Sequence, residues 1–468
     1  MKDLRNISDW DLSKSEKFRP QGGSAPLRLR LEGLNEYFEH LDSPVGIQSQ
    51  MWQTAKQIAV KRLRFNESGQ PTTLKAVIDR GLGEDKYNTN SGYSLYLKRK
   101  SKEAITNTLT VGWNAFSDKY PFTLGTRATM GKTGIDARNI FMAPMAINVC
   151  GQSYQQPLQD YLRSLCLDFF LPWEGWDSVQ ANISKCWDSG LKFGADYTKM
   201  DQHFNIHHAR EVFDVVKHYF RRQYWDQLLV AIEYPFTAPI LTNLGYIDQE
   251  HALASGSEWT NFLETVWNYV FVVYLELKYH LSFVTAMGIG DDQLWILEGK
   301  WTDKMQKWII QTVIKEFALF GLPGNSEKQE VSMVKTGFLQ RHMVDEWNGP
   351  NGDVRAAGVY SLIRNATSEV YPERYHNEKD WDTQMFALRC IMIAENCNMH
   401  PEFKWYVQEW LAKANKNIIE FVLQADSVIR ETQKRARNIA NFLPTYNQEK
   451  QDQDILTFDV VKLLREVA

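Results

Sequence analysis

Two adjacent aspartates, Asp291 and Asp292, follow Gly288-Ile289-Gly290 between two β-prone runs at residues 281–287 and 293–297. Glycine and aspartate at this point are typical of a tight hairpin turn, which would lift both carboxylates off the strand ends. Like charges this close repel each other, and a divalent cation between them would relieve the repulsion. The pattern favours a metal-binding hairpin, although a Gly-Asp-Asp tripeptide by itself is usually only a turn.

A second pair of carboxylates, Asp196 and Asp201, lies five residues apart. The apolar run over 190–198 predicts a buried strand ending at Asp196, and residues 199–222 predict a helix. The first carboxylate would then reach a metal ion, and the second, about one helical turn away, could face a sugar hydroxyl. The alternative for Asp201 is a structural charge in the first turn of a helix, where the helix dipole favours it.

The third element is the run of small residues that begins at Ala254 and includes Ser255 and Gly256. Small side chains allow a close backbone approach, and a helix is predicted from there to about Tyr274. Its polar residues recur at intervals of four and share one face: Thr260, Glu264 and Asn268. A helix-capping serine would produce the same local pattern, so the motif alone is of moderate specificity.

The order of the three elements is more specific than any one of them. An aspartate pair, then Ser-Gly-x-x-x-Thr, then Gly-Asp-Asp, spaced by about 60 and 35 residues, resembles motifs A, B and C in the palm of viral RNA-dependent RNA polymerases. The form Ser255-Gly256-Ser257-x-x-Thr260 and the small size look most like picobirnaviruses and partitiviruses, which have double-stranded RNA genomes.

The resemblance implies a two-metal nucleotidyl transfer with Mg²⁺, for which Mn²⁺ can substitute. The implied metal ligands are Asp196, Asp291 and Asp292. Lys328 stands where the family places a proton donor to the leaving pyrophosphate. The residues implied in nucleotide binding are Arg127, Lys132 and Arg138 of a basic fingers motif, Asp201, Ser255, Gly256, Thr260, Glu264 and Asn268. Ser91 and Gly92 look like a template-guiding motif, and Arg341 ends a segment similar to a primer-grip turn.

The position of Glu264 departs from many relatives. The picornavirus type carries Asn there, whereas an acid is common in partitivirus-like enzymes. The sequence therefore leaves open whether Glu264 or Asn268 joins Asp201 in sensing the ribose 2′-hydroxyl.

The implied architecture is an α+β right-hand polymerase. Fingers with an N-terminal arm are expected over 1–190, and a palm with an antiparallel sheet over 191–344. A fingers insertion is expected at about 210–250 within the palm. The turn cluster at 348–353 marks a boundary, and a helical thumb is expected over 345–468.

The composition is that of a globular protein, with 44% hydrophobic and 24% charged residues. The abundant aromatic residues, 16 Trp, 20 Tyr and 24 Phe, indicate core packing, with base stacking open to only a few. The net charge is −4, yet residues 51–140 carry 15 Lys and Arg against 7 Asp and Glu. This basic block suits phosphate binding or an ordinary solvated surface. The five cysteines include no CxxC pair, which argues against a disulfide framework or a structural zinc site.

The expected partners are an RNA template and its product, ribonucleoside triphosphates and a viral capsid protein, with no membrane. The expected locations are the virion interior and the host cytoplasm, where the enzyme would replicate and transcribe a viral RNA genome. Three alternatives remain. A reverse transcriptase usually has an aromatic residue where this chain has Ile289-Gly290. A non-catalytic, capsid-associated RNA-binding protein would not need the acids, and a metal-dependent phosphohydrolase would not need the ribose-sensing helix.

Overall fold

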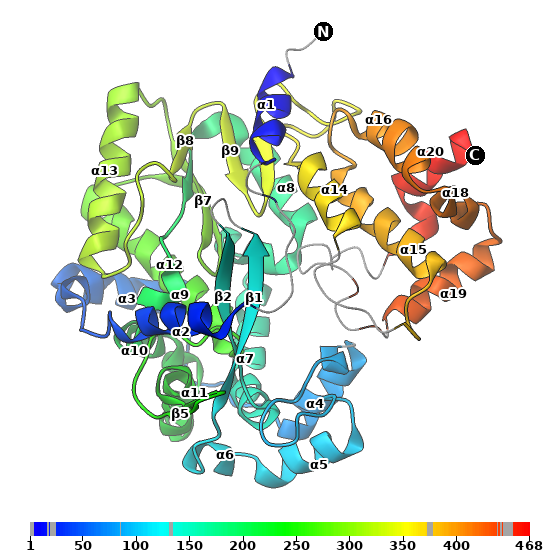
Figure 1. Cartoon of the computed structure of the whole chain (residues 1–468). Helices are drawn as coiled ribbons and strands as arrows, with labels where there is room; N and C mark the ends of the chain where they lie inside the picture. Colours follow the sequence, from blue (N-terminus) through cyan, green and yellow to red (C-terminus); the bar gives the residue numbers. More distant parts are fainter. Residues whose placement is uncertain are drawn as a thin grey trace.

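The computed structural model describes residues 4–15, 18, 25–84, 86–130, 134–371, 378–437, 439, 442 and 453–468. Figure 1 shows helices and short sheets arranged around a central hairpin, with the C-terminal helices gathered on the right in yellow to red. This mixture of helices and antiparallel sheets confirms the α+β class. The division into three domains at residues 190 and 344 stays a prediction.

The central antiparallel sheet has the strand order β6-β7-β3-β8. Its strands are β3 (Gly190–Ala195), β6 (Phe283–Ile289), β7 (Asp292–Glu298) and β8 (Glu330–Ser332). β3 is buried along its whole length, as its apolar run predicts. It ends just before Asp196, whose backbone N–H bonds to the Gln329 side chain at 3.2 Å instead of continuing the ladder.

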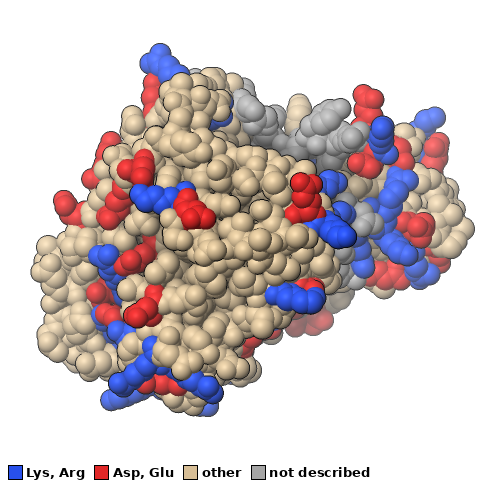
Figure 2. All heavy atoms as spheres, turned by 90° about the horizontal axis from the view of Figure 1, so that it is seen from below, with Lys and Arg blue, Asp and Glu red and all other residues tan. Residues whose placement is uncertain are grey.

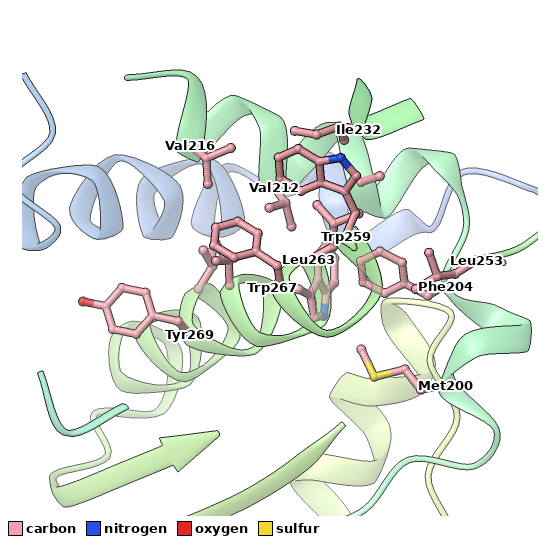
Figure 3. Close-up of a cluster of buried hydrophobic side chains, with 14 of the residues drawn as sticks. Met200, Phe204, Val212, Val216, Ile232, Leu253, Trp259, Leu263, Trp267 and Tyr269 are labelled. Atoms are coloured by element: carbon pink, nitrogen blue, oxygen red, sulfur yellow. The ribbon is translucent and has the colours of Figure 1, made fainter. Parts of the chain in front are cut away.

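Helix α12 (Trp259–Tyr279) packs beside β6 and supports the hairpin formed by β6 and β7. It is buried almost all the way round because α3 (Gln50–Arg62) and α10 (Ile206–Val216) cover its other faces. Figure 3 shows Trp259, Leu263 and Trp267 of this helix directed into the surrounding apolar side chains. The rings of Trp52 and Trp267 lie 4.6 Å apart. Most of the aromatic excess seen here therefore belongs to the core.

A second sheet has the order β2-β1-β4-β5. The long hairpin of β1 (Phe122–Met130) and β2 (Ile135–Met142), called the finger hairpin below, is joined by β4 (Ile240–Thr242) and β5 (Gly245–Ile247). β4 lies parallel to β1, with Phe122 opposite Ile240. The segment between β3 and α12 thus returns to the finger hairpin. Helix α7 (Met145–Ser164) follows directly after β2.

The N-terminal residues contact two separate parts of the molecule. Helix α2 (Leu27–Asn35) lies along β2, where the Asn139 side chain donates to the Arg30 carbonyl at 3.0 Å. Helix α1 (Arg5–Ser13) lies instead against β10 (Arg341–Val344) and α14 (Leu362–Val370), near the C-terminal helices. There Asp11 accepts from the Ser361 hydroxyl and from the Leu362 backbone N–H.

After β8 the chain forms a small sheet and then mostly helices. The sheet contains β9 (Lys335–Phe338), β10 (Arg341–Val344) and β11 (Val359–Tyr360). The larger helices that follow are α14 (Leu362–Val370), α15 (Thr383–Ala394), α18 (Lys416–Val422), α19 (Asp426–Arg437) and α20 (Asp459–Val467). They bury a second apolar cluster of their own.

The prediction of one continuous helix over 199–222 is wrong. The structure has α9 (Met200–His203) and then α10, separated by Phe204 and Asn205. The first helix ends at Phe204, whose backbone is extended, and Asn205 begins the second, because its side chain accepts from the backbone N–H of His207 at 3.0 Å. Asp201 therefore lies on a separate single-turn helix, α9, whose orientation differs from that of a continuous helix with α10.

Many cations of the basic block at 51–140 are paired on the surface. Arg80 bonds Asp160 at 2.7 Å, and Lys119 bonds Asp248 at 2.8 Å. On the face shown in Figure 2, blue and red side chains lie beside one another rather than in a patch of one sign. These cations therefore fit the interpretation as an ordinary solvated surface. The prediction of phosphate binding then concerns the cations of the finger hairpin. None of the described helices is long and apolar enough to cross a membrane.

Candidate active site

A cavity of about 820 Å³ lies where the central sheet, the start of α12, the finger hairpin and α2 meet. Half of the residues predicted from the sequence to act in the site line it: Arg138, Asp201, Ser255, Thr260, Glu264, Asp291, Asp292 and Arg341. They come from segments up to 203 residues apart in the sequence, from Arg138 to Arg341. The fold therefore gathers the three predicted motifs around one open space.

The hairpin between β6 and β7 presents two of the carboxylates. Its turn is tighter than expected, with Gly290 and Asp291 between the strands and Asp292 already paired with Ile289. Gly290 has φ +58°, the left-handed region that glycine adopts without strain. Helix α12 fixes the turn from below, because the Gly290 N–H donates to Thr265 Oγ1 and its carbonyl accepts from Asn268 Nδ2, both at 2.8 Å.

Asp196 reaches the same edge from the neighbouring strand. Ala195 is paired with Gln293 in the antiparallel register, so the next residue along β3 lies beside Asp292. Asp196 is about half exposed, and its Oδ2 lies 4.0 Å from Lys328 Nζ. Neither Asp196 nor Lys328 lines the cavity itself. The two lie together at its margin.

Asp201 and Glu264 form a carboxyl–carboxylate pair in the cavity wall. Burial, followed by the charges of Asp201 and Asp291, raises the pKa of Glu264 well above its usual range. Burial also raises the pKa of Asp201, while a hydrogen bond from Glu264 opposes that rise. We therefore assign one shared proton to the pair, with Glu264 as donor and Asp201 as acceptor. The positive charge of Arg138 opposes the rise in both pKa values.

The geometry separates the two candidate partners of Asp201. Asn268 is fully buried and does not line the cavity. Its Oδ1 accepts from the Tyr197 hydroxyl at 2.7 Å, and its Nδ2 donates to the Gly290 carbonyl. Glu264 faces the cavity beside Asp201. In the described part of the chain the Thr260 hydroxyl, one turn earlier, is buried without a hydrogen-bond partner.

The finger hairpin brings two of its predicted cations together. Arg127 of β1 is directly opposite Arg138 of β2 in the register, so both side chains stand on the same face of the sheet. Like charges in this position destabilise a sheet unless an anion lies between them. Arg138 lines the cavity. Lys132, the third predicted cation, lies outside the described residues.

The loop before α12 is held against the finger hairpin. Gly256 has φ +112°, and a Cβ at this position would lie 2.0 Å from the Phe141 carbonyl oxygen. The neighbouring Ser255 carbonyl accepts from the Phe141 N–H at 3.0 Å. The close backbone approach expected from the small residues is therefore present, and its partner is β2.

The predicted template and primer residues occupy different places. Arg341 lines the cavity, and its guanidinium lies 4.3 Å from the centre of the Trp176 ring. Ser91 and Gly92 lie outside the cavity, in the loop before α5 (Lys102–Val111). Ser91 is buried, and its carbonyl accepts from the N–H of Met145 at the start of α7.

Several cavity residues were missed by the sequence analysis. The Tyr37 hydroxyl bonds Ser255, and burial together with the charge of Asp201 raises its pKa. Lys199 pairs with Glu36 at 2.5 Å. Glu258 also lines the cavity. Lys199 could have been noted from its place between the two aspartates, whereas Tyr37 has no local signal because only the folded chain brings it there.

The carboxylates offer the oxygen ligands that Mg²⁺ and Mn²⁺ prefer. Among the described residues, however, no group of three or more His, Cys, Asp and Glu side chains is drawn together closely enough to hold a metal ion. The donor set thus fits a divalent cation by chemistry and by strand register.

Carboxylates at the end of β3 and at the β6–β7 turn, a cationic hairpin and a helical C-terminal region are arranged as in a right-hand polymerase fold. The chain is 25% identical, over 96% of its length and 84% of the relative's, to a potential RNA-dependent RNA polymerase of human picobirnavirus (strain Human/Thailand/Hy005102/-). No family profile matches.

Solved structures agree with this fold. The crystal structure of the RNA-dependent RNA polymerase of a human picobirnavirus matches with a TM-score of 0.79 and 20% identity, covering 99% of this chain and 88% of that one. An insertion-loop deletion mutant of a human picobirnavirus polymerase matches with a TM-score of 0.74 over the same shares. The resemblance predicted from the three motifs is therefore confirmed.

Proposed function

We propose that this chain is an RNA-directed RNA polymerase that joins ribonucleotides on an RNA template. The observation that carries the proposal is the convergence of Asp201, Asp291 and Arg138 on one cavity beneath the finger hairpin. A binding protein without catalysis would have no need for acids at both strand ends. The similarity to a potential picobirnavirus polymerase along nearly the whole chain supports the same reaction.

Asp196 and Asp291 would hold two divalent cations, Mg²⁺ or Mn²⁺, with Asp292 in support. Bound there, the cations would lower the pKa of the RNA 3′-hydroxyl and neutralise charge on the triphosphate. Arg138, with Arg127 and Lys132, would hold the triphosphate in line for attack. Lys328, 4.0 Å from Asp196, would donate a proton to the leaving pyrophosphate.

The remaining site residues would select and position the nucleotide. The Asp201–Glu264 pair would bond the ribose 2′-hydroxyl, with Thr260 one turn away on α12. The loop of Ser255 and Gly256 would contact the templating base. Ser91 and Gly92 would guide the template, and Arg341 would hold the primer strand. Contact with a capsid protein and action inside a virion and in the host cytoplasm stay predictions.

The test is incorporation of labelled ribonucleotides on a single-stranded RNA template with Mg²⁺ or Mn²⁺. We expect template-length product that depends on the RNA template and on all four ribonucleotides. A DNA template of the same sequence and deoxynucleotides are the matched controls. Product made only from deoxynucleotides would indicate a reverse transcriptase, and intact RNA binding without product would contradict the polymerase proposal.

Metal binding can be measured without catalysis. We expect Mn²⁺ added to the native chain to lose its free-ion electron paramagnetic resonance signal as it binds, and Asp196→Asn with Asp291→Asn to weaken binding by at least about tenfold, or about 1.4 kcal/mol. The matched control is Asp353→Asn, the same change at an exposed residue that does not line the cavity. Equal Mn²⁺ affinity in all three proteins would place the metal site elsewhere.

A further inference from the structure

A cluster of polar groups lies between the loop at 88–99, helix α7 and the loop that precedes α12. With its amide nitrogen toward the acid, Asn148 donates to Glu258 Oε2 at 2.5 Å, and its oxygen accepts from Arg99 Nη2 at 3.2 Å. Arg99 also donates from Nε to the Asn90 carbonyl at 3.1 Å. A chain of hydrogen bonds therefore runs from residue 90 to residue 258.

Asn148, in the middle of the cluster, is buried, whereas Arg99 and Glu258 at its two ends are partly exposed. Burial lowers the pKa of Arg99, which the charge of Glu258 partly offsets. Burial raises the pKa of Glu258 to about 8. Either protonation state of Glu258 can accept the Asn148 hydrogen bond, because each keeps an oxygen lone pair available. Buried polar groups of this kind fix geometry strongly, since breaking one bond leaves its partner unsatisfied.

Helix α7 is shaped to admit the carboxyl group. Gly151 faces it, and a Cβ at that position would lie 1.5 Å from Glu258 Oε1 and 2.8 Å from Trp259 Nε1. No side chain larger than hydrogen fits there without moving Glu258. The place of this carboxyl is therefore set by backbone as well as by hydrogen bonds.

At one end of the cluster Glu258 lines the central cavity, two residues after Gly256. At the other end, the residue 88–99 loop contains Ser91 and Gly92. The two ends thus belong to the two regions that the proposed function assigns to the template and to the nucleotide.

We propose that Arg99, Asn148 and Glu258 form a positioning relay that fixes the loop at 255–258 relative to the loop at 88–99. The relay thereby couples the position of the cavity wall to the position of the template path. Glu258 acts through Asn148 and Arg99 and is a positioning residue rather than a catalytic one. The inference rests on the proposed function for the identity of the ligand, single-stranded RNA.

The test measures binding of a single-stranded RNA oligonucleotide to the full chain by fluorescence anisotropy, without nucleotides. Arg99→Met and Glu258→Leu should each weaken binding by about tenfold, the loss of one hydrogen bond to a charged group. Their combination should be no weaker than either alone, because both changes break the same chain. Glu258→Gln keeps an acceptor oxygen for Asn148 and should bind within about threefold of the native chain.

One further variant controls for charge, and a second disturbs the position of Glu258 through the backbone. Lys98→Met removes an exposed neighbouring cation and should have a smaller effect than Arg99→Met. Gly151→Ala should weaken binding as Glu258→Leu does, with no polar group removed. Melting temperatures show whether each variant is folded.

The outcomes separate the relay from the polymerase proposal. Additive losses from Arg99→Met and Glu258→Leu, or a loss in Glu258→Gln as large as in Glu258→Leu, would overturn the relay. Absence of RNA binding by the native chain would overturn both. If the losses of RNA affinity in the two variants are non-additive but the native chain makes no product, the result would support the relay and contradict only the catalytic function.

Discussion

Replacing Asp291 by Asn lowers the rate of ribonucleotide incorporation by about 10³-fold while template binding is unchanged. The side chain keeps its size, so the β6–β7 turn, bonded to α12 through Gly290, keeps its shape. The substitution removes a negatively charged oxygen from the metal site. A bound metal ion stabilises the transition state by several kcal/mol, and each 1.36 kcal/mol lost from the barrier lowering slows the reaction tenfold. Single-turnover incorporation on a primed template measures it.

The control for Asp291→Asn is Asp353→Asn, which we expect to be as active as the native chain. A second check is the melting temperature without metal. Removing one of several crowded acids relieves repulsion, so Asp291→Asn should melt no lower than the native chain. Native-level incorporation by Asp291→Asn would show that the carboxylates of the hairpin do not serve the reaction.

Replacing Glu264 by Leu lowers the preference for ribonucleotides over deoxynucleotides by about 10- to 100-fold. Glu264 supplies the proton that it shares with Asp201, and this pair faces the cavity. A hydrogen bond to a charged group contributes about 1.5–3 kcal/mol, and only the ribonucleotide makes it. The ratio of kcat/KM for ATP and dATP on one template measures the change.

Two variants distinguish ribose recognition from general damage. Glu264→Gln keeps a donor for Asp201 and should retain the ratio within a few fold. Asn268→Leu removes the bonds to Tyr197 and Gly290, so incorporation of both nucleotides should fall while their ratio is kept. The reverse result, a changed ratio in Asn268→Leu and an unchanged one in Glu264→Leu, would assign ribose sensing to Asn268.

The parts of the site that could be predicted are those with short-range signals. A turn sequence placed Asp291, a buried run placed Asp196 near a strand end, and helical spacing placed Thr260 and Glu264 on one face. The same spacing could not choose between Glu264 and Asn268. They share a face, and only the depth of α12 beneath the hairpin shows that the cavity ends before Asn268.

The parts that could not be predicted depend on contacts between distant segments. Tyr37 reaches Ser255 only because α2 lies along the finger hairpin. The division of the predicted helix at Asn205 needed a cap that propensity alone does not show. The basic block was ambiguous because charge counts do not show pairing, and Arg80 and Lys119 have acidic partners far away in sequence.

The burial of α12 determines how easily the active-site turn unfolds. Hydrogen bonds exposed at loops and ends open locally at little cost, whereas those in the core open only with the whole protein. The N–H of Gly290 donates to the Thr265 hydroxyl on α12, a helix most of whose residues are buried. Its exchange with solvent therefore requires an opening close in free energy to global unfolding, so the turn that carries Asp291 persists for as long as the core does.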